Sequence, residues 1–330
     1  MAGSSAGYPA DFYEVYRMKT ILSMIRAHNP IVLHRHKSPD GDALGSQIGL
    51  KKIILSNFPE KTVYMTGDEA GRYAFMEDSV MDDVPDDVFP SALSVILDCG
   101  AAHLISDDRW QQAKAVCRMD HHLFCGAVAP YEVVDSTYES CCGLICDFCL
   151  QTGLQIPSDA ATALYTGMIT DSGRFRYDAT SPRTLRLAAH LLEQGVDTNE
   201  MYRNLYASDF DQMLLRAQYT QKIRFTPAHV AYIYTTKEEM AQSGHEEFAI
   251  SRGMVSIMND IRGVDIWANF TETEKGVLCE LRSSRFNINP VAVKYGGGGH
   301  QKASGATVAD KETVLAMLKD LDAIMEENAQ

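Results

Sequence analysis

The stretch PIVLHRHKSPDGDALGSQIGLKKIILSNF, residues 30–58, predicts a short β-strand, a polar loop and a helix in direct succession. The loop reads HKSPDGD and holds one histidine and two aspartates within seven residues, His36 to Asp42. Taken alone, aspartates beside proline and glycine are best explained as turn residues. An imidazole and two carboxylates at this spacing also suit a divalent cation, so the choice depends on what the rest of the chain supplies.

The same alternation of strand and helix continues through the first half of the chain. Short apolar, β-branched runs predict strands, and runs with a period near 3.6 predict helices. Further strands are expected over 61–67, 92–100 and 113–122, and helices over 11–29, 139–153, 158–173, 181–195 and 198–221. This alternation is typical of an α/β domain in which helices cover both faces of a mainly parallel sheet.

After about Ile223 the pattern changes and predicts a smaller α+β domain. Strands with hairpin turns are expected over 230–240, 263–284 and 303–309, and helices over 251–261 and 311–327. A length of 330 residues agrees with two domains. We therefore expect an α/β domain over 1–190, of which 1–10 form a flexible arm, a helical linker over 191–222 and the α+β domain over 223–330.

Charge and hydropathy narrow the range of partners and compartments. The net charge of −14 at pH 7 argues against a binder of long duplex nucleic acid, because such proteins need a basic face. Small phosphorylated substrates need only a local basic pocket. No apolar run approaches the roughly 18 residues of a membrane span, and the N-terminus lacks the basic and apolar segments of a signal peptide. We expect a soluble, cytoplasmic protein that does not enter membranes.

Half of the eight cysteines lie in one short segment, ESCCGLICDFCLQTG at 139–153. Cys142, Cys146 and Cys149 are spaced four and three residues apart, so they share one face of the predicted helix. A zinc site would show paired cysteines at two separated places. We interpret the cluster as buried core rather than as a metal site or disulfides.

Aspartates and histidines follow the predicted strands or lie in the loops beyond them. The candidates are His36, Asp40, Asp42, Asp98, Asp120, His121, His122 and Asp171. Ligands of parallel α/β sheets bind outside the carboxyl ends of the strands, so these side chains can converge on one point. Each has a simpler explanation by itself: Asp98 could cap the next helix, and adjacent histidines often form a structural pair. Their joint occurrence favours a centre for two divalent ions, which can clamp an in-line displacement at phosphorus.

Four ordered motifs resemble those of the DHH phosphoesterase family: HKSPDGDALGS at 36–46, ILDCG at 96–100, DHH at 120–122 and TDSGRFRY at 170–177. GGGGHQKASG at 296–305 resembles the signature of the DHHA1 substrate domain. The resemblance covers nearly the whole chain beyond the N-terminal arm. Within the family the chain is most similar to the NrnA subgroup of bifunctional oligoribonucleases, which also remove the 3′-phosphate of adenosine 3′,5′-bisphosphate. The stretch STYESCCG at 136–143 departs from the family pattern, which bears on fine substrate preference rather than on the metal site.

The resemblance implies a role for each candidate in the first domain. Two Mn²⁺ ions are implied, with Mg²⁺ as the alternative. The first ion would be held by His36, Asp40 and Asp98. The second would be held by Asp42, Asp98, His121 and Asp171, with Asp98 bridging. His122 would face the scissile phosphate, where it stabilises charge or protonates the leaving oxygen, and Asp120 would orient a histidine ligand.

The glycine-rich segment of the second domain suggests an anion site. Consecutive glycines let several backbone N–H groups approach one anion, although a glycine-rich run is more often a linker. Arginines in CELRSSRFN lie nearby in sequence, and arginine binds phosphate through two parallel hydrogen bonds. The residues that the resemblance implies for substrate binding are Arg282, Ser283, Gly297, Gly298, Gly299 and His300, and Arg285 is added although a surface arginine is usually only solvated.

The expected activity is a Mn²⁺-dependent phosphodiesterase that degrades very short oligoribonucleotides, such as pApA, to nucleoside 5′-monophosphates. It would also dephosphorylate adenosine 3′,5′-bisphosphate. One alternative is a phosphodiesterase for cyclic di-AMP or for pGpG-type products. Another is a nucleotide sensor without catalysis, which would be expected to have lost some of the metal ligands. A homodimer is implied because members of the family often form dimers.

Overall fold

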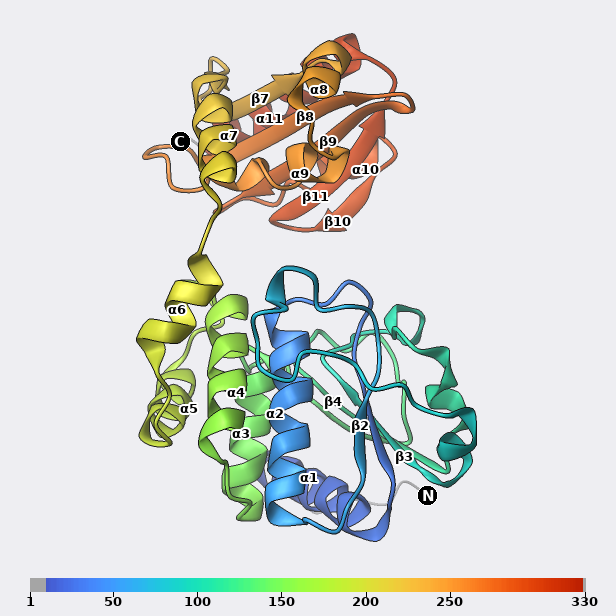
Figure 1. The fold of residues 1–330 in the computed structure, drawn as a ribbon. Coiled ribbons are helices and arrows are strands. Elements are labelled where there is room, and N and C mark those ends of the chain that lie inside the picture. The colour runs from blue at the N-terminus through green and yellow to red at the C-terminus, as the bar shows by residue number, and fades with distance from the viewer. Residues whose placement is uncertain (1–9, 329–330) are drawn as a thin grey trace, which may run out of the picture. The chain divides into compact units, whose positions relative to one another are not determined.

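The protein is described by a computed structural model that covers residues 10–328 of the chain (Figure 1). The chain forms two compact units, one up to Ala207 and the other from Ser208 onward. The flexible arm predicted over 1–10 lies outside the described residues except for Ala10, which begins the first helix. None of the helices within residues 10–328 has the length and apolarity that a membrane span requires.

The first unit is built on a five-stranded sheet with the order β2-β1-β3-β4-β5. All neighbouring strands are parallel. The strands are β1 (Ile31–His34), β2 (Val63–Met65), β3 (Leu93–Leu97), β4 (Ala115–Asp120) and β5 (Tyr131–Val134). The predicted α/β class and the first four strands are confirmed. Strand β5 was not predicted, because a run of four residues within a polar loop carries almost no periodic signal.

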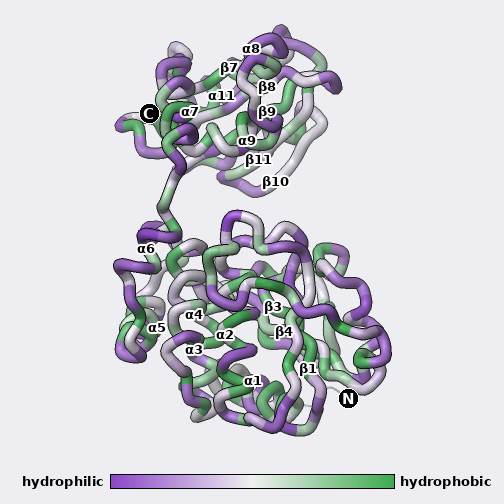
Figure 2. Tube along the Cα trace, in the orientation of Figure 1, coloured by the Kyte–Doolittle hydropathy of each residue, from purple (hydrophilic) through white to green (hydrophobic). Residues whose placement is uncertain are grey.

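The two faces of this sheet pack against different material. The helices are α1 (Ala10–Ala27), α2 (Gly41–Asn57), α3 (Cys141–Thr152), α4 (Ser158–Asp171), α5 (Pro182–Glu193) and α6 (Thr198–Tyr206). Leu33 and Leu97 on one face share the main core with these helices. On the other face, Val32 packs against Phe89 of a 3₁₀ turn. In Figure 2 the strands β3 and β4 are mostly hydrophobic, whereas the surface loops are largely hydrophilic.

The cysteine-rich segment forms α3, and its four cysteines are fully buried free thiols. Ser140 caps the helix by accepting a hydrogen bond from the backbone N–H of Gly143, and Gly153 ends it in the left-handed conformation. The interpretation of these cysteines as core residues is confirmed.

Helices α2 and α4 approach closely because α2 presents glycines at every fourth position. A Cβ atom at Gly45 would lie 2.5 Å from the backbone oxygen of Ala163 in α4. A Cβ atom at Gly167 of α4 would lie 2.3 Å from the Sγ of Cys142 and 3.1 Å from the Cα of Asp42. The small residues therefore let the first turn of α2, which carries Asp42, lie near the end of α4, which carries Asp171.

The single helix predicted over 198–221 is wrong. The chain forms α6, an extended break, and then α7 (Phe210–Gln221). Ala207 and Asp209 both have extended backbones, with ψ of 135° and 147°. The break coincides with the boundary between the two compact units and falls inside the segment predicted as a linker.

The second unit carries a six-stranded sheet with the order β10-β11-β9-β8-β7-β6. Its strands are β6 (Arg224–Phe225), β7 (Ala231–Thr235), β8 (Ile266–Thr273), β9 (Gly276–Ser283), β10 (Gly298–His300) and β11 (Ala303–Val308). Only the β7–β8 pair is parallel. The helices are α8 (Lys237–Ser243), α9 (Glu247–Ser251), α10 (Asn289–Lys294) and α11 (Lys311–Glu327).

The predicted α+β class of this unit is confirmed, but the helix expected over 251–261 is wrong. Helix α9 ends at Ser251, and a short 3₁₀ turn follows over Val255–Met258. Gly253 lies between them, and glycine is a poor residue for a helix interior because its backbone loses the most freedom there.

Candidate metal centre

The loop after β1 presents His36 and Asp40 to the centre. Asp40 is the N-cap of α2, and its Oδ1 accepts hydrogen bonds from the N–H groups of Asp42 and Ala43, both at 3.0 Å. Asp40 therefore has a structural role, that of a helix cap rather than of a turn residue. The same Oδ1 lies 3.8 Å from Nε2 of His36. The Nδ1 of His36 lies 2.8 Å from the carbonyl oxygen of Lys37 and must be the donor, so Nε2 is the nitrogen that can bind a metal ion.

Asp42 enters the centre from the first turn of α2 and is held by the N-terminus of α3. Its Oδ2 accepts a hydrogen bond from the backbone N–H of Cys141 at 2.7 Å, and its Oδ1 accepts one from Cys142 at 2.9 Å. The side chain is almost fully buried. A helix N-terminus stabilises a carboxylate, so this grip fixes both the position and the orientation of Asp42.

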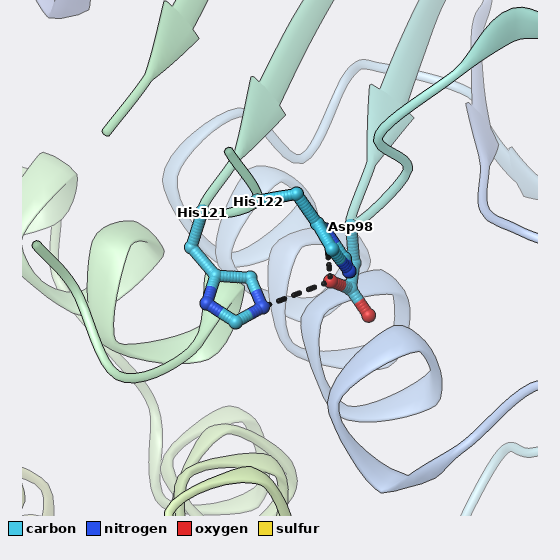
Figure 3. A group of neighbouring side chains, drawn as sticks. All are labelled: Asp98, His121 and His122. Carbon is cyan, nitrogen blue, oxygen red and sulfur yellow. Dashed lines mark ion pairs between the residues drawn. The ribbon is translucent and has the colours of Figure 1, made fainter. Parts of the chain in front are cut away.

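Asp98 lies in the middle of the group, directly after β3, and is 2% exposed. Its Oδ2 is 3.5 Å from Nε2 of His36. Its Oδ1 is 3.4 Å from Nε2 of His121 and 3.6 Å from Nδ1 of His122 (Figure 3). That Oδ1 is buried and accepts no hydrogen bond from any side chain or backbone group within residues 10–328. A buried carboxylate oxygen without a partner costs free energy unless a cation binds it. This environment is the one expected of a carboxylate shared by two metal ions.

His121 follows β4 and faces three carboxylates with one nitrogen. Its Nε2 lies 3.4 Å from Asp98, 3.4 Å from Asp171 and 3.7 Å from Asp42. Its Nδ1 lies 3.4 Å from the carbonyl oxygen of Tyr138, which orients the ring. As in His36, Nδ1 faces a backbone carbonyl oxygen and Nε2 faces the carboxylates.

His122 has a different environment. Its Nδ1 is 2.7 Å from Oδ1 of Asp120, a fully buried carboxylate at the end of β4. The His122 side chain is 47% exposed, so its ring opens toward solvent and can meet a substrate. The hydrogen bond to Asp120 is the largest influence on His122 and raises its pKa.

The charges of the group are mutually dependent. Burial, followed by repulsion from Asp98, raises the pKa of Asp42, and burial raises the pKa of Asp171 to about 7. Burial opposes charge on His36 and His121, but the neighbouring carboxylates outweigh it and raise both pKa values to about 11. Burial also acts against the Asp98 carboxylate, but the imidazoles of His121 and His36 hold its pKa well below its usual range. The group thus retains protons that a divalent cation would displace.

Among the described residues, three groups of side chains could each hold a metal ion. The two clusters made of predicted ligands are His36, Asp40 and Asp98, and Asp42, His121 and Asp171, whose His121 also contacts Asp98. The third group is Asp98, His121 and His122. Within each cluster the ligand atoms lie within 4.8 Å of one another. Carboxylate oxygens with one imidazole nitrogen per cluster suit Mn²⁺ or Mg²⁺, so the residues fit two divalent ions. The structure thus brings together all six residues that the sequence analysis assigned to metal.

The predicted substrate residues lie together at one edge of the second unit. His300 of β10 pairs with Ala303 of β11, which pairs in turn with Arg282 of β9, so these three residues share one face of the sheet. The Arg282 guanidinium is 3.0 Å from Oε2 of Glu280. The Ser283 hydroxyl is buried and accepts hydrogen bonds from the N–H groups of Arg285 and Phe286. It therefore fixes the turn and does not face that surface.

The glycine-rich segment forms a hairpin edge instead of the expected loop. Gly298 and Gly299 belong to β10 and pair with Gly305 and Ser304 of β11. Gly299 has a φ of +134°, and a Cβ atom at Gly297 would lie 2.0 Å from the carbonyl oxygen of Gly305. Glycine is required at both positions by backbone conformation or close packing. Arg285 is mostly exposed, and its Nη1 is 3.5 Å from a carboxylate oxygen of Asp265.

Two buried arginines beside the centre were not predicted. Arg118 of β4 lies 3.7 Å from Asp120 and 3.1 Å from Glu132. Arg35 directly precedes His36 and is fully buried. For Arg118 the available signal was a charged residue inside a largely apolar strand, since arginine is almost never fully buried without partners.

Comparisons with known proteins identify relatives over nearly the whole chain. Residues 30–168 match the model of the DHH family, N-terminal domain, and residues 229–327 match that of the DHHA1 domain. A Streptococcus mutans protein named a probable bifunctional oligoribonuclease and PAP phosphatase NrnA is 34% identical, over 92% of this chain and 98% of its own. The Bacillus subtilis bifunctional oligoribonuclease and PAP phosphatase NrnA is 28% identical, over 94% and 100%. A solved Bacteroides fragilis structure, described as an exopolyphosphatase-related protein, shares the fold with a TM-score of 0.83 at 24% identity, over 94% of this chain and 96% of that chain.

Proposed function

This chain belongs to the DHH family and carries a DHHA1 domain, and from that premise we propose that it hydrolyses very short oligoribonucleotides to nucleoside 5′-monophosphates. We propose that it also removes the 3′-phosphate of adenosine 3′,5′-bisphosphate. Relatives named for both activities match over more than nine-tenths of the chain. The observation that carries the proposal is Asp98, a buried carboxylate with an unsatisfied oxygen at the junction of two donor clusters.

The proposed ligands of one ion are His36, Asp40 and Asp98, and those of the other are Asp42, Asp98, His121 and Asp171. Two divalent ions, when bound, would supply a water of lowered pKa and neutralise charge on the phosphate. The backbone carbonyls at Nδ1 of His36 and His121 hold each Nε2 toward its cluster. The α3 N-terminus holds Asp42 in the same way.

His122 is the proposed general acid. Asp120 accepts a hydrogen bond from its Nδ1, so the ring is fixed in orientation and its charged form is favoured. In that charged form Nε2 carries a proton, which it can give to the leaving oxygen. Asp120 acts through His122 and does not itself contact the substrate.

The proposed substrate surface is the face of β9, β11 and β10 that carries Arg282 and His300. Arginine would grip a terminal phosphate by displacing its present partner Glu280. Gly297, Gly298 and Gly299 would allow a nucleotide to approach the backbone at this edge, with Ser283 and Arg285 shaping the adjacent turn. A local basic edge on a chain of net charge −14 favours a short ligand with a terminal phosphate over a long polyanion.

Manganese is proposed as the preferred ion because each cluster combines an imidazole with carboxylates. The domain limits, the cytoplasmic location and a homodimer remain part of the proposal on the strength of the family resemblance. A nucleotide sensor without catalysis is the alternative from another class.

A substrate panel tests the proposal. The wild type in Mn²⁺ is incubated with pApA, pGpG, adenosine 3′,5′-bisphosphate, cyclic di-AMP and a 20-nucleotide single strand, and the products are separated by chromatography. We expect AMP from pApA and from the bisphosphate, and little product from the cyclic dinucleotide or the long strand. Preferred cleavage of cyclic di-AMP or pGpG would support the alternative phosphodiesterases. Tight binding of pApA with no product would support the sensor.

A further inference from the structure

Arg35 is a fully buried arginine in the loop that carries His36 and Asp40, and its hydrogen bonds join this loop to two other segments. Its Nε donates to Oε1 of Gln47 at 3.0 Å, and its Nη1 donates to the carbonyl oxygen of His36 at 3.2 Å. Its Nη2 donates to the carbonyl oxygen of Asp68. Within residues 10–328 its guanidinium forms no ion pair, and its three acceptors are neutral oxygens on three different segments.

Gln47 extends this network to the two strands beneath the loop. Its Nε2 donates to the carbonyl oxygen of Leu33 at 2.8 Å and to that of Thr66 at 2.9 Å. Leu33 belongs to β1, and Thr66 directly follows β2. The amide thereby joins the carboxyl ends of both strands, while its own oxygen holds Arg35 in place.

Asp68 closes the network on the far side of the loop. Its Oδ2 accepts the backbone N–H of Ser38 at 2.7 Å, and its Oδ1 accepts the hydroxyl of Ser106 at 2.7 Å. Ser38 has a φ of +52°, a conformation that a non-glycine residue adopts only when its surroundings enforce it. The loop is therefore held at the carbonyl of His36 and at the N–H of Ser38.

The other half of the centre is supported by separate elements. Asp42 is held by the backbone of Cys141 and Cys142, and His121 is oriented by the carbonyl oxygen of Tyr138. None of these supports is a hydrogen-bond partner of Arg35, Gln47 or Asp68. The two clusters of donors thus have largely separate supports, and they also meet directly where Asp40 caps the helix turn that carries Asp42.

We propose that Arg35 is a positioning residue for one of the two metal ions, the ion held by His36 and Asp40, and has little effect on the other. The inference rests on the proposed function in that it takes the two clusters to be metal sites. Partners that orient ligands typically change metal affinity by roughly 10–100-fold. Loss of the guanidinium would release the His36 carbonyl and the Asp68 segment together.

The test is a Mn²⁺ titration in which free Mn²⁺ is measured by electron paramagnetic resonance. It uses the wild type, Arg35→Met, Asp171→Ala and the double variant. We expect two tight ions in the wild type, one in each single variant and none in the double variant, with the affinity of the lost ion reduced by roughly 10–100-fold. Arg109→Met, which removes an arginine bonded to Asp107 and Asp86, is the matched control and should keep both ions.

Further variants distinguish a positioning role of Arg35 from an effect of its charge and from a loss of folding. Arg35→Lys keeps the charge but cannot reach three acceptors, so it should behave like Arg35→Met; full recovery with lysine would overturn the positioning role. Asp68→Ala removes an exposed side chain, so it should fold and weaken the same ion even if Arg35→Met does not fold. Equal weakening of both ions, or one ion retained in the double variant, would overturn the inference alone. A wild type that binds no Mn²⁺ would overturn the proposed function as well.

Discussion

The close contact between α2 and α4 places Asp42 and Asp171 in one centre, and the substitution Gly45→Ala tests that contact. A Cβ atom at position 45 would lie 2.5 Å from the carbonyl oxygen of Ala163, 3.0 Å from the Sγ of Cys142 and 3.2 Å from the backbone nitrogen of Gly167. Two of these atoms belong to the backbone of α4. The clash can be relieved only if a helix shifts, because no side-chain rotation moves those atoms.

The expected loss of stability follows from two opposing effects. Alanine in a helix interior is favoured over glycine by about 1 kcal/mol. Overpacking a filled core costs about 1–3 kcal/mol, and a backbone contact lies toward the upper end of that range. The net destabilisation is about 1–2 kcal/mol, which lowers the Tm of a unit of this size by roughly 2–8 °C. A shift of α4 would also move Asp171, so the affinity for Mn²⁺ should fall.

Gly49→Ala is the matched control in the same helix. Its Cβ atom would lie 2.6 Å from Cδ2 of Leu164, the end of a side chain, and 3.5 Å from the nearest backbone atom of α4, the oxygen of Ala160. The helix-propensity gain and a smaller clash should nearly cancel, within about 1 kcal/mol. Stability is measured by thermal and urea unfolding followed by circular dichroism, and Mn²⁺ binding by titration. A Gly45→Ala protein as stable as the wild type, or less perturbed than Gly49→Ala, would refute the role of the glycine contact.

Three further predictions concern single residues. Burial lowers the pKa of His34 from 6.5 to about 4, so between these pH values the unfolded chain binds a proton and the folded chain does not. The free energy of unfolding should therefore fall by up to about 3 kcal/mol as the pH drops from 6.5 to 4, and His34→Gln should reduce this pH dependence. Parallel pH–stability curves of the wild type and His34→Gln would contradict the prediction. His122→Asn should lower kcat by roughly 10²–10⁴-fold with Mn²⁺ binding unchanged, and loss of metal instead would make His122 a ligand. Arg282→Met should raise KM for pApA far more than Arg285→Met, since Arg285 is mostly exposed; equal effects would disprove a specific phosphate grip.

The sequence predicts the centre well because parallel strands share one chemical end. His36, Asp98 and His121 each follow a strand of the same sheet, so three local predictions of strand ends suffice to bring them together. Asp171 does not follow a strand and reaches the centre because α4 packs on α2. This packing depends on the small residues Gly45 and Gly167, and the contact between the two helices could not be predicted from the sequence. Asp171 was predicted among the residues that lie beyond strand ends, whereas the structure places it at the end of α4.

What the sequence did not predict depends on contacts between distant segments. The carboxylate of Asp42 is bound by the N–H of Cys141, ninety-nine residues away, and no periodic pattern records such a pair. Arg35 and Asp68 are linked in the same non-local way. The break between α6 and α7 was not predicted for another reason. Only Ser208 and Asp209 interrupt a run whose composition otherwise favours a helix.

The central claim is that Asp98 joins two metal ions into one hydrolytic centre, and AMP release from pApA tests it most directly. The wild type and Asp98→Asn are compared over a time course in Mn²⁺, with a chelator as a second control, after circular dichroism has shown that both are folded. The account predicts steady AMP release by the wild type and release at background level with Asp98→Asn or the chelator. Turnover by Asp98→Asn at the wild-type rate, or no turnover by a wild type that binds two Mn²⁺ ions, would contradict it.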